Sequence, residues 1–308
     1  MTALPILLLP VYRGGQMFRE AIQSIQPCLP WFDSVVISLN GENVDEDETT
    51  ALELNQLCRL TILSTRRNFT SVQHLQFISR QLNKTLRLAP DTPLFILCHD
   101  DLLHRPGFER LDQKQWREWG SNCISLGDYL VFGQTSSSAS PRHESWFARY
   151  DALNSRPKSA FLMTQYQRHD DPFTNLSGMR LSLGVLRSTL RYFSITRSRS
   201  GMRMEYSLIV NKAIQNVINF DPPLVCVREH SGSVGANVSR RDFAASELRY
   251  AIWIWLNCRS IPSWKLLLQG QYGVSGLFRL IQIFSLHRYY DLLGRIRSWM
   301  ARRGMISP

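Results

Sequence analysis

The chain has 308 residues and a formal net charge of +11 at pH 7. Hydrophobic residues make up 44% of the sequence and charged residues 20%, which are values of a globular protein and exclude a disordered or fibrous chain. This length suffices for one large α/β domain with an extension, or for two modest domains, and for a sizeable buried core.

The six cysteines are scattered along the chain, without a Cys-x-x-Cys pair or a short-loop framework. This pattern favours the reduced thiols of a cytoplasmic protein over disulfides or a zinc site. The first apolar run, Ile6–Leu9, is short, lacks a basic leader and runs into Pro10, so we expect a core strand and not a signal peptide. No uncharged apolar run reaches the roughly 18–20 residues that a membrane-spanning helix needs.

The first hundred residues alternate apolar runs of strand length with segments of helical spacing. The expected strands are Ile6–Tyr12, Asp33–Leu39, Arg59–Ser64 and Leu94–Cys98, and the expected helices are Met17–Ile25 and Phe69–Leu88, with an acidic loop entering a helix at Glu42–Glu53. Strands separated by helices pair in parallel, which predicts an α/β fold with a doubly wound, mostly parallel sheet. Ligands of such sheets bind at the carboxyl ends of the strands.

The rest of the chain has a less regular pattern. Residues 133–158 include the polar stretch Gln134–Ser140 and are expected to form a lid or a linker. Gly178–Leu190 and Glu205–Ile218 indicate helices or strand–helix pieces. Pro222-Pro223 predicts a turn before a final short strand, Leu224–Val227.

Three polar residues, His99, Asp100 and Asp101, end the apolar run Leu94–Cys98. Two adjacent carboxylates at the exit of a buried strand are costly to hold together without a cation. Hard cations such as Mg²⁺ and Mn²⁺ prefer oxygen ligands and keep coordination sites open for phosphate oxygens. The pair therefore indicates a divalent-metal site for a diphosphate, and the alternative is a pair of surface turn residues.

Four motifs in the first 110 or so residues follow in order: LLLPVYRGGQMFREAIQSI, FDSVVISLNGE, RRNFTSVQHL and LFILCHDDLLHRPGFERL. This order resembles the nucleotide-sugar-binding half of family 2 glycosyltransferases, which have the GT-A fold. The resemblance implies that Asp100 and Asp101 hold Mg²⁺ or Mn²⁺, with either one as the direct ligand. It also implies that the donor is bound by Pro10, Tyr12, Asn40, Arg67, Asn68 and His99.

The second half resembles the same family at three places. Asn175-Leu176-Ser177-Gly178, followed by LSLGVLRSTLRYF, is similar to the acceptor-side stretch. RSRSGMRMEY is similar to the acidic motif that supplies the catalytic base, which implies that role for Glu205. Arg228-Glu229-His230 is similar to a late Arg-x-His segment, which implies that Arg228 contacts phosphate and that His230 contacts the metal or the diphosphate.

The sequence also departs from the family at three positions. The acid that usually ends the second strand is replaced by Asn40 or Ser38, and the segment at Asn68 lacks its usual glycine. Cys98 or His99 stands where the first acid of the metal motif is usual. These departures leave open a catalytically inactive relative of the family.

The resemblance implies an inverting transfer of a sugar from a UDP-, dTDP- or GDP-sugar to a hydroxyl of a glycan or polyprenyl-linked acceptor. Bacterial surface polysaccharide synthesis, of O-antigen or capsule, is the expected setting by analogy. The expected organisation is a glycosyltransferase domain over residues 1–240, with its donor half at 1–110 and its acceptor half at 111–240. Residues 241–308 are expected to form a basic helical extension.

The excess positive charge is concentrated near the end of the sequence. Residues 265–308 carry seven Lys and Arg residues against one acidic residue, Asp291. Leu277–Met300 has the spacing of a basic amphipathic helix, which either lies on an anionic membrane or packs on the protein body. We expect the former, at the inner face of the cell membrane.

Two rival functions have different sequence signatures. A nucleic-acid-binding protein would interleave basic and aromatic residues along a recognisable module, which is not found, so no nucleic-acid partner is expected. A metal-dependent nucleotidyltransferase would show a glycine-rich phosphate loop with a lysine near the first strand. Arg13-Gly14-Gly15 is too short for that loop.

Overall fold

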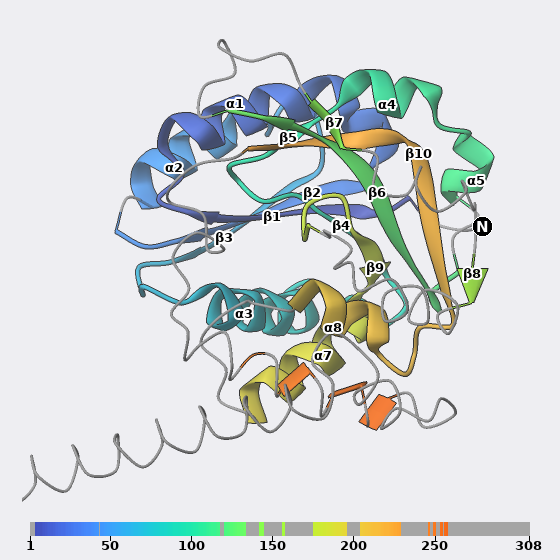
Figure 1. Ribbon diagram of the computed structural model, residues 1–308. Coiled ribbons are helices and arrows are strands. Elements are labelled where there is room, and N and C mark those ends of the chain that lie inside the picture. The colour runs from blue at the N-terminus through green and yellow to red at the C-terminus, as the bar shows by residue number, and fades with distance from the viewer. Residues whose placement is uncertain are drawn as a thin grey trace, which may run out of the picture.

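The computed structural model describes residues 4–42, 44–117, 120–133, 142–144, 156–157, 175–195 and 204–228, with further single residues between 246 and 257. These residues form a layered α/β fold in which one sheet is covered by helices on both faces (Figure 1). The expected fold class, a doubly wound and mostly parallel sheet with flanking helices, is confirmed.

Four parallel strands form the first part of the sheet in the order β3-β2-β1-β4. Their bounds are Ile6–Tyr12 for β1, Ser34–Asn40 for β2, Leu60–Thr65 for β3 and Pro93–Ile96 for β4. Tyr12 lies opposite Asn40, and Asn40 lies opposite Thr65. The carboxyl ends of β1, β2 and β3 are therefore level with one another at one edge.

The second part of the sheet continues from β4 in the order β9-β6-β10-β5. The bounds are Arg180–Ser182 for β9, Cys123–Phe132 for β6, Asn216–Arg228 for β10 and Leu102–Leu103 for β5. β6 and β10 form a long parallel pair, whereas β9 is antiparallel to β4 and to β6. Two short strands, β7 at Arg142–Glu144 and β8 at Arg156–Pro157, pair with β6 and β10.

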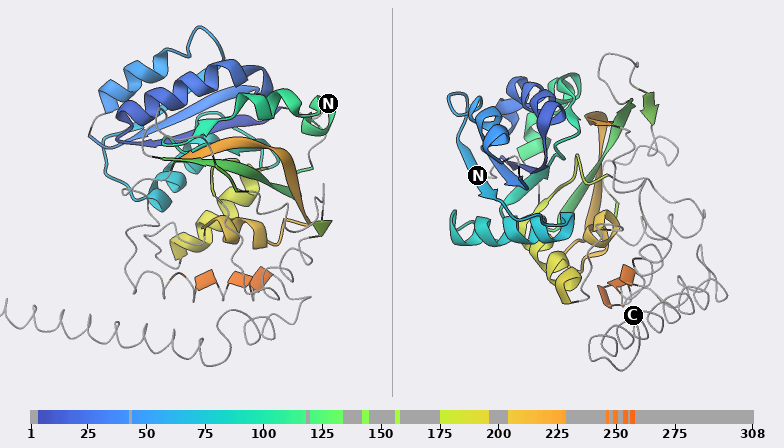
Figure 2. Two further views of the ribbon diagram at one scale, coloured as in Figure 1. Left: turned by 45° about the horizontal axis from the view of Figure 1, so that its top comes forward. Right: turned by 90° about the vertical axis from the view of Figure 1, so that its left-hand side faces the viewer.

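Helices cover both faces of this sheet (Figures 1 and 2). One face carries α1 (Gly15–Ile25), the 3₁₀ helix η1 (Gln26–Trp31), α2 (Val44–Leu52), α4 (Arg105–Arg110) and α5 (Gln113–Arg117). The other carries α3 (Ser71–Lys84), α7 (Leu183–Ile195) and α8 (Met204–Val210). β1 contributes Leu7 and Leu9 to the core on the first side and Leu8 to the core on the second. This alternation is the pattern of a strand that is buried on both faces.

Local signals account for most element boundaries. β1 has the predicted bounds, and α3 begins at Ser71 because the Thr70 side chain and Gln73 form a capping box there. The predicted turn at Pro222-Pro223 is wrong, since β10 continues through it with a register shift between Phe220 and Val225. Proline lacks the N–H group that the ladder needs, so it causes an irregularity in the strand without ending it.

The start of α1 is occupied by a carboxylate of the protein itself. The backbone N–H groups of Gly14 and Gly15 donate to the side chain of Asp47 over 3.0 and 3.1 Å, and Asp47 is buried. A negative charge at a helix N-terminus is favourable because the helix dipole is positive there. Asp47 therefore accepts the hydrogen bonds of these backbone amides, which in a phosphate-binding loop would be donated to a phosphate of the nucleotide.

Described residues beyond 240 pack against α7 and α8. The Trp253 ring lies 4.3 Å from the Tyr192 ring, and its Nε1–H donates to the Ser207 carbonyl over 2.7 Å. The predicted amphipathic helix at Leu277–Met300 lies outside the described residues. Among the helices of the described ranges, none is long and apolar enough to cross a membrane.

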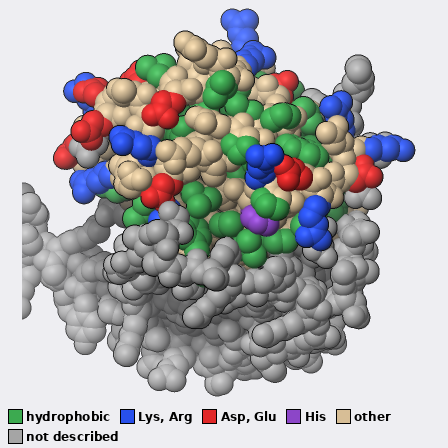
Figure 3. Space-filling view, turned by 90° about the horizontal axis from the view of Figure 1, so that it is seen from above, with side chains coloured by type: hydrophobic (Ala, Val, Ile, Leu, Met, Phe, Trp, Pro, Cys, Tyr) green, Lys and Arg blue, Asp and Glu red, His purple; other side chains and the backbone are tan. Residues whose placement is uncertain are grey.

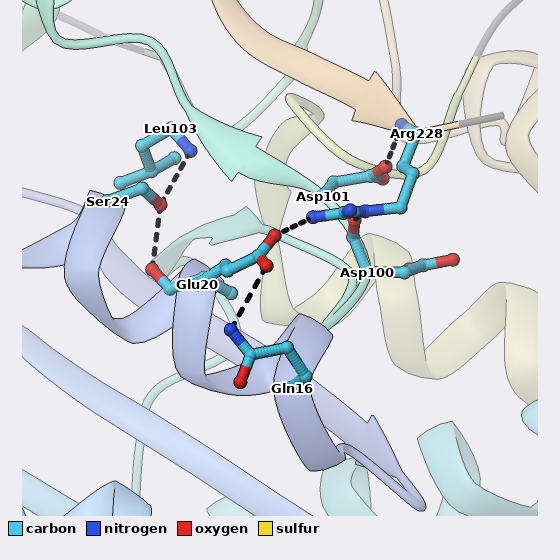
Figure 4. Close-up of polar contacts among 8 residues, drawn as sticks. Gln16, Glu20, Ser24, Asp100, Asp101, Leu103 and Arg228 are labelled. Atoms are coloured by element: carbon cyan, nitrogen blue, oxygen red, sulfur yellow. Dashed lines mark hydrogen bonds and ion pairs between the residues drawn. The ribbon is translucent and has the colours of Figure 1, made fainter. Parts of the chain in front are cut away.

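One buried cation, the guanidinium of Arg228, joins three elements at the end of β10 (Figure 4). It forms an ion pair with Glu20 of α1 over 2.5 Å, and its side chain is only 1% exposed. Its Nε–H donates to the Asp100 carbonyl over 2.9 Å, and its guanidinium carbon lies 4.6 Å from the centre of the Phe132 ring. Arg228 thereby fixes the loop after β4 against both α1 and β10.

We expect Glu20→Gln to lower the free energy of unfolding by about 3 kcal/mol, because it replaces the anionic partner in the ion pair of the buried Arg228 with a neutral amide. Urea denaturation measures this loss. Glu109→Gln is the matched control, since the Arg105–Glu109 pair has side chains 63% and 54% exposed and should contribute less than about 1 kcal/mol. Equal losses in the two variants would contradict a structural role for the Glu20–Arg228 pair.

Candidate active site

The loop after β4 carries the predicted acidic pair. β4 ends at Ile96, and the Leu97 N–H donates to the Leu8 carbonyl of β1 over 3.0 Å. The Asp101 N–H then donates to the Cys98 carbonyl over 3.1 Å, which closes a tight turn from Cys98 to Asp101. The acidic pair therefore lies at the exit of a buried parallel strand, where ligands of such sheets bind.

Asp101 is buried and held by two hydrogen bonds. Its Oδ1 accepts from the Arg228 backbone N–H over 2.8 Å, and its Oδ2 accepts from the Ser177 hydroxyl over 2.5 Å. Burial, and then the charge of Asp100, raise the pKa of Asp101 to about 7, although the two hydrogen bonds oppose this rise. Asp101 is thus an anchored carboxyl group that ionises less readily than a solvent-exposed aspartate, although the charge of Arg228 also favours its ionised form.

Asp100 is more exposed than Asp101, and its carboxylate points away from the Glu20–Arg228 ion pair (Figure 4). One ligand atom each from Cys98, Asp100 and Asp101 lie within 4.8 Å of one another. A metal ion could bind between these three side chains, which form the group of acidic, histidine and cysteine residues found close enough together among the described residues. Two carboxylates beside a sulfur form a donor set that fits a divalent metal.

Ser177 connects the two ends of the turn, a role that the sequence analysis did not predict. Its hydroxyl accepts from the Cys98 N–H over 2.8 Å while it donates to Asp101. Ser177 is held in turn by the Gly178 N–H, which donates to the Ile96 carbonyl over 2.9 Å, with Gly178 at a φ of +87°. The motif containing Ser177 was visible in the sequence, but its contact with a turn 76 residues away was not.

Glu205 lies in the first turn of α8 and is half-buried. Burial raises the pKa of the Cys98 thiol well above its ordinary value, and the charges of Asp100, Asp101 and Glu205 raise it further. The fold therefore brings Glu205 within electrostatic reach of the Cys98–Asp101 turn. Its role as a catalytic base stays a prediction.

The predicted donor-side residues of β1 and β2 lie at the same edge of the sheet. Tyr12 is 40% exposed at the end of β1, with the Arg13 guanidinium 5.3 Å from its ring centre. Pro10 is half-buried within β1. Asn40 is buried, and its side chain exchanges two hydrogen bonds with the backbone of Phe69, over 3.0 and 3.1 Å. Asn40 thus fixes the loop after β3 onto the end of β2.

Arg67 and Asn68 are exposed on that loop, and the Asn68 side chain donates to Glu42 over 3.2 Å. His99 is half-buried, beside the buried His74. Burial lowers the pKa of His74 to about 4, and His99 adds to this effect. His230 lies outside the described residues. The structure thus brings Tyr12, Asn40 and the Asp pair to one edge, while His230 stays a prediction.

Arg228 was predicted to contact phosphate. Its guanidinium instead faces Glu20 and the Asp100 carbonyl, and its backbone N–H binds Asp101. This geometry supports a positioning role for Arg228, and direct contact with phosphate stays a prediction. Glu20 was not predicted, because a single acid on the exposed side of an amphipathic helix gives no signal of a partner 208 residues away.

The surface of the helical face shows mixed charge. In Figure 3, acidic and basic side chains over α1, α2 and α4 are interspersed with hydrophobic ones. The described part of this face therefore lacks the continuous basic stripe that tracks a nucleic-acid backbone.

Neither a protein-family model nor a curated protein sequence matches the chain. Its fold is similar to that of GalNAc-T7 solved with UDP, GalNAc and Mn²⁺, with a TM-score of 0.51 and 10% identity over 97% of this chain and 58% of that one. Two further similar structures each have a TM-score of 0.48. A mannosyltransferase of Pyrobaculum calidifontis, solved with GDP-Man and Mn²⁺, is 12% identical over 99% of this chain and 84% of that one. Residues 1–349 of Staphylococcus aureus TarS are 11% identical over 91% of this chain and 68% of that one. The similarity to GalNAc-T7 shows a fold like that of the GT-A glycosyltransferases.

Proposed function

We propose that the chain is a metal-dependent, inverting glycosyltransferase that moves a sugar from a nucleoside-diphosphate sugar to a hydroxyl group. The observation that carries this proposal is the Cys98–Asp101 turn at the exit of β4, with Glu205 in electrostatic reach. The turn offers a cation site, and Glu205 offers a base on a different element. A metal-dependent transfer from a diphosphate donor to a hydroxyl acceptor uses both.

Asp100 and Asp101 would hold the divalent cation, Mg²⁺ or Mn²⁺. When bound, such a cation stabilises the negative charge that develops on the leaving diphosphate. Asp101 is oriented by Ser177 and by the Arg228 N–H, so its position is set before any ligand binds. The Arg228 side chain binds the backbone carbonyl of Asp100, the more exposed acid. The Asp100 carboxylate points away from the Glu20–Arg228 ion pair. Arg228 thus acts on the site by positioning both acids.

Glu205 would accept the proton of the acceptor hydroxyl as that oxygen attacks the sugar. A carboxylate within hydrogen-bond reach of the hydroxyl contributes about 10²–10⁴-fold to such a step. The attack comes from the face opposite the leaving diphosphate, which gives inversion at the anomeric carbon. The location of Glu205 at the start of α8, near the turn but on another element, supports this role.

The donor class is supported by the edge at which Tyr12, Asn68 and the turn lie, together with the UDP bound to GalNAc-T7. We propose a UDP-, dTDP- or GDP-sugar as donor, bound by the residues that the sequence motifs indicate. The acceptor would be a glycan or polyprenyl-linked hydroxyl used in surface polysaccharide synthesis. The basic residues of 265–308 would hold the enzyme on the anionic inner face of the cell membrane.

Asp100→Asn should weaken Mn²⁺-dependent binding of UDP or GDP by at least about tenfold, because it removes an anionic ligand of the cation. The Tm should stay close to that of the wild type, since this side chain is only half-buried. Calorimetry with Mn²⁺ and each nucleotide, after a thermal-shift screen of nucleotide sugars, measures the effect. Asp33→Asn, an exposed acid at the opposite end of the sheet, is the control. Unchanged binding in both Asp100→Asn and Asp101→Asn would rule out the metal site.

Glu205→Gln should lower kcat of sugar transfer by about 10²–10⁴-fold, because an amide cannot accept the hydroxyl proton. The KM for the donor should change little, since Glu205 acts on the acceptor. Steady-state kinetics with the donor found in the screen separate the two quantities. Glu53→Gln, an exposed acid elsewhere, should retain wild-type kcat. A rise in the donor KM with an unchanged kcat would assign Glu205 to binding and not to catalysis.

The cation-free protein should lose stability from Asp101 as the pH rises from 5 to 8. The folded-state pKa of about 7 lies above the ordinary value of 3.8, so the fold binds this proton more tightly than the unfolded chain does. The stabilisation is therefore full at low pH and is lost as the pH rises through about 7. The difference in unfolding free energy between wild type and Asp101→Asn isolates the contribution of Asp101 and the groups coupled to it, because uncoupled groups, such as His74, titrate equally in both.

Mn²⁺ should reverse that loss, since a cation favours the ionised carboxylate. Its stabilising effect should be larger at pH 8 than at pH 5 in the wild type, and it should be reduced in Asp101→Asn. A difference between the two proteins that does not change with pH would contradict the raised pKa.

A further inference from the structure

The sulfur atom of Cys98 faces the same point as the two carboxylates of the proposed cation site. Its Sγ and one oxygen each of Asp100 and Asp101 lie within 4.8 Å of one another. A divalent ion such as Zn²⁺ binds oxygen at about 2.0–2.2 Å and sulfur at about 2.3 Å, so two of its ligands are separated by at most about 4.5 Å. Only a small adjustment of side chains would place all three atoms around one ion.

Hydrogen bonds hold the backbone of Cys98 in the turn without any ligand. The Cys98 N–H donates to the Ser177 hydroxyl, and the Cys98 carbonyl accepts from the Asp101 N–H. The same Ser177 hydroxyl donates to Asp101. One side chain therefore orders both ends of the turn, in which the Cys98 sulfur lies close to the two carboxylates.

The surroundings of this sulfur differ from those of a cysteine that merely fills a core. A buried thiol usually packs as a small hydrophobic group. Cys98 instead lies among the negative charges of Asp100, Asp101 and Glu205. The nearby cation, Arg228, is turned toward Glu20 of α1. A further positive charge beside the sulfur would offset this concentration of negative charge.

We propose that Cys98 is a third ligand of the divalent cation and sets the metal preference of the site, an inference that rests on the proposed function. On binding, the S–H bond breaks, a sulfur–metal bond forms and the proton leaves to water. Sulfur is a softer ligand than oxygen, so it favours Mn²⁺ over Mg²⁺ and favours Co²⁺ and Zn²⁺ further. A site made of carboxylates alone would lack this preference.

Co²⁺ tests the proposal, because a bond between sulfur and Co²⁺ gives a charge-transfer band in the near ultraviolet that oxygen ligands do not give. We expect wild-type protein titrated with Co²⁺, alone and then with UDP or GDP, to develop this band with one equivalent of metal. Cys98→Ser should lose the band and bind Co²⁺ and Zn²⁺ at least about tenfold more weakly, while its Mg²⁺ affinity stays nearly unchanged. Calorimetry measures the three affinities.

Two matched variants test the assignment to Cys98. Cys226→Ser removes the thiol of β10 that lies opposite Leu102, beside the site, and Cys58→Ser removes a thiol that contacts Leu54. Both should keep the band. A band that disappears in Cys226→Ser and persists in Cys98→Ser would overturn the proposal.

The wild-type spectrum is decisive even if Cys98→Ser fails to fold. Co²⁺ that binds wild type, and is lost in Asp100→Asn, without any charge-transfer band would overturn the role of Cys98 and leave the proposed function standing. A wild-type protein that binds none of these cations, with or without nucleotide, would overturn both.

Discussion

The architecture of the site depends on one buried cation, Arg228. A guanidinium is costly to remove from water, and its side chain here is 1% exposed. The ion pair with Glu20, the hydrogen bond to the Asp100 carbonyl and the face of the Phe132 ring together offset that cost. Because these partners belong to α1, the loop after β4 and β6, satisfying the charge forces the three elements into one arrangement. The contacts of Arg228 thus also fix the positions of Asp100 and Asp101.

The same arrangement places the carboxylates of Asp100 and Asp101 where their negative charges interact unfavourably. Asp101 is buried beside Asp100, and its two hydrogen bonds do not fully offset the desolvation of its charge, as its raised pKa shows. Helix α1 also holds the segment that follows, since the Ser24 hydroxyl accepts from the Leu103 N–H over 3.0 Å. The acids cannot relax by moving apart without breaking these contacts. A rigid turn with unfavourably placed negative charge is a physical basis for binding a cation, and this links the packing of the fold to the proposed chemistry.

Local patterns in the sequence predicted much of the donor half. The apolar run at Ile6–Tyr12 and the helical spacing within Phe69–Leu88 are properties of neighbouring residues, and the structure has a strand with the first bounds and a helix, Ser71–Lys84, within the second. β6 was missed because residues 123–132 contain glycine and aspartate and lack a clear alternation. The prolines at 222 and 223 predicted a turn, but pairing with β6 on both sides of them maintains β10 through the irregularity. Tertiary pairing there outweighed a local preference.

The sequence by itself determined the order of strands and helices in the first hundred residues, the buried character of β1 and β2, and the presence of an acidic pair at a strand exit. It could do so because these features are set by periodicity and by adjacent residues. Only the tertiary structure decided which groups meet that pair. Ser177 is 76 residues from Asp101, Arg228 is 127 residues from Asp101, and Glu20 is 208 residues from Arg228. Each is an ordinary polar residue in its local context. A hydrogen bond between distant segments produces no pattern in the sequence of either segment, so it cannot be predicted from neighbouring residues. The fold therefore shows a positioning role for Arg228 that the sequence did not predict, while its contact with phosphate stays a prediction.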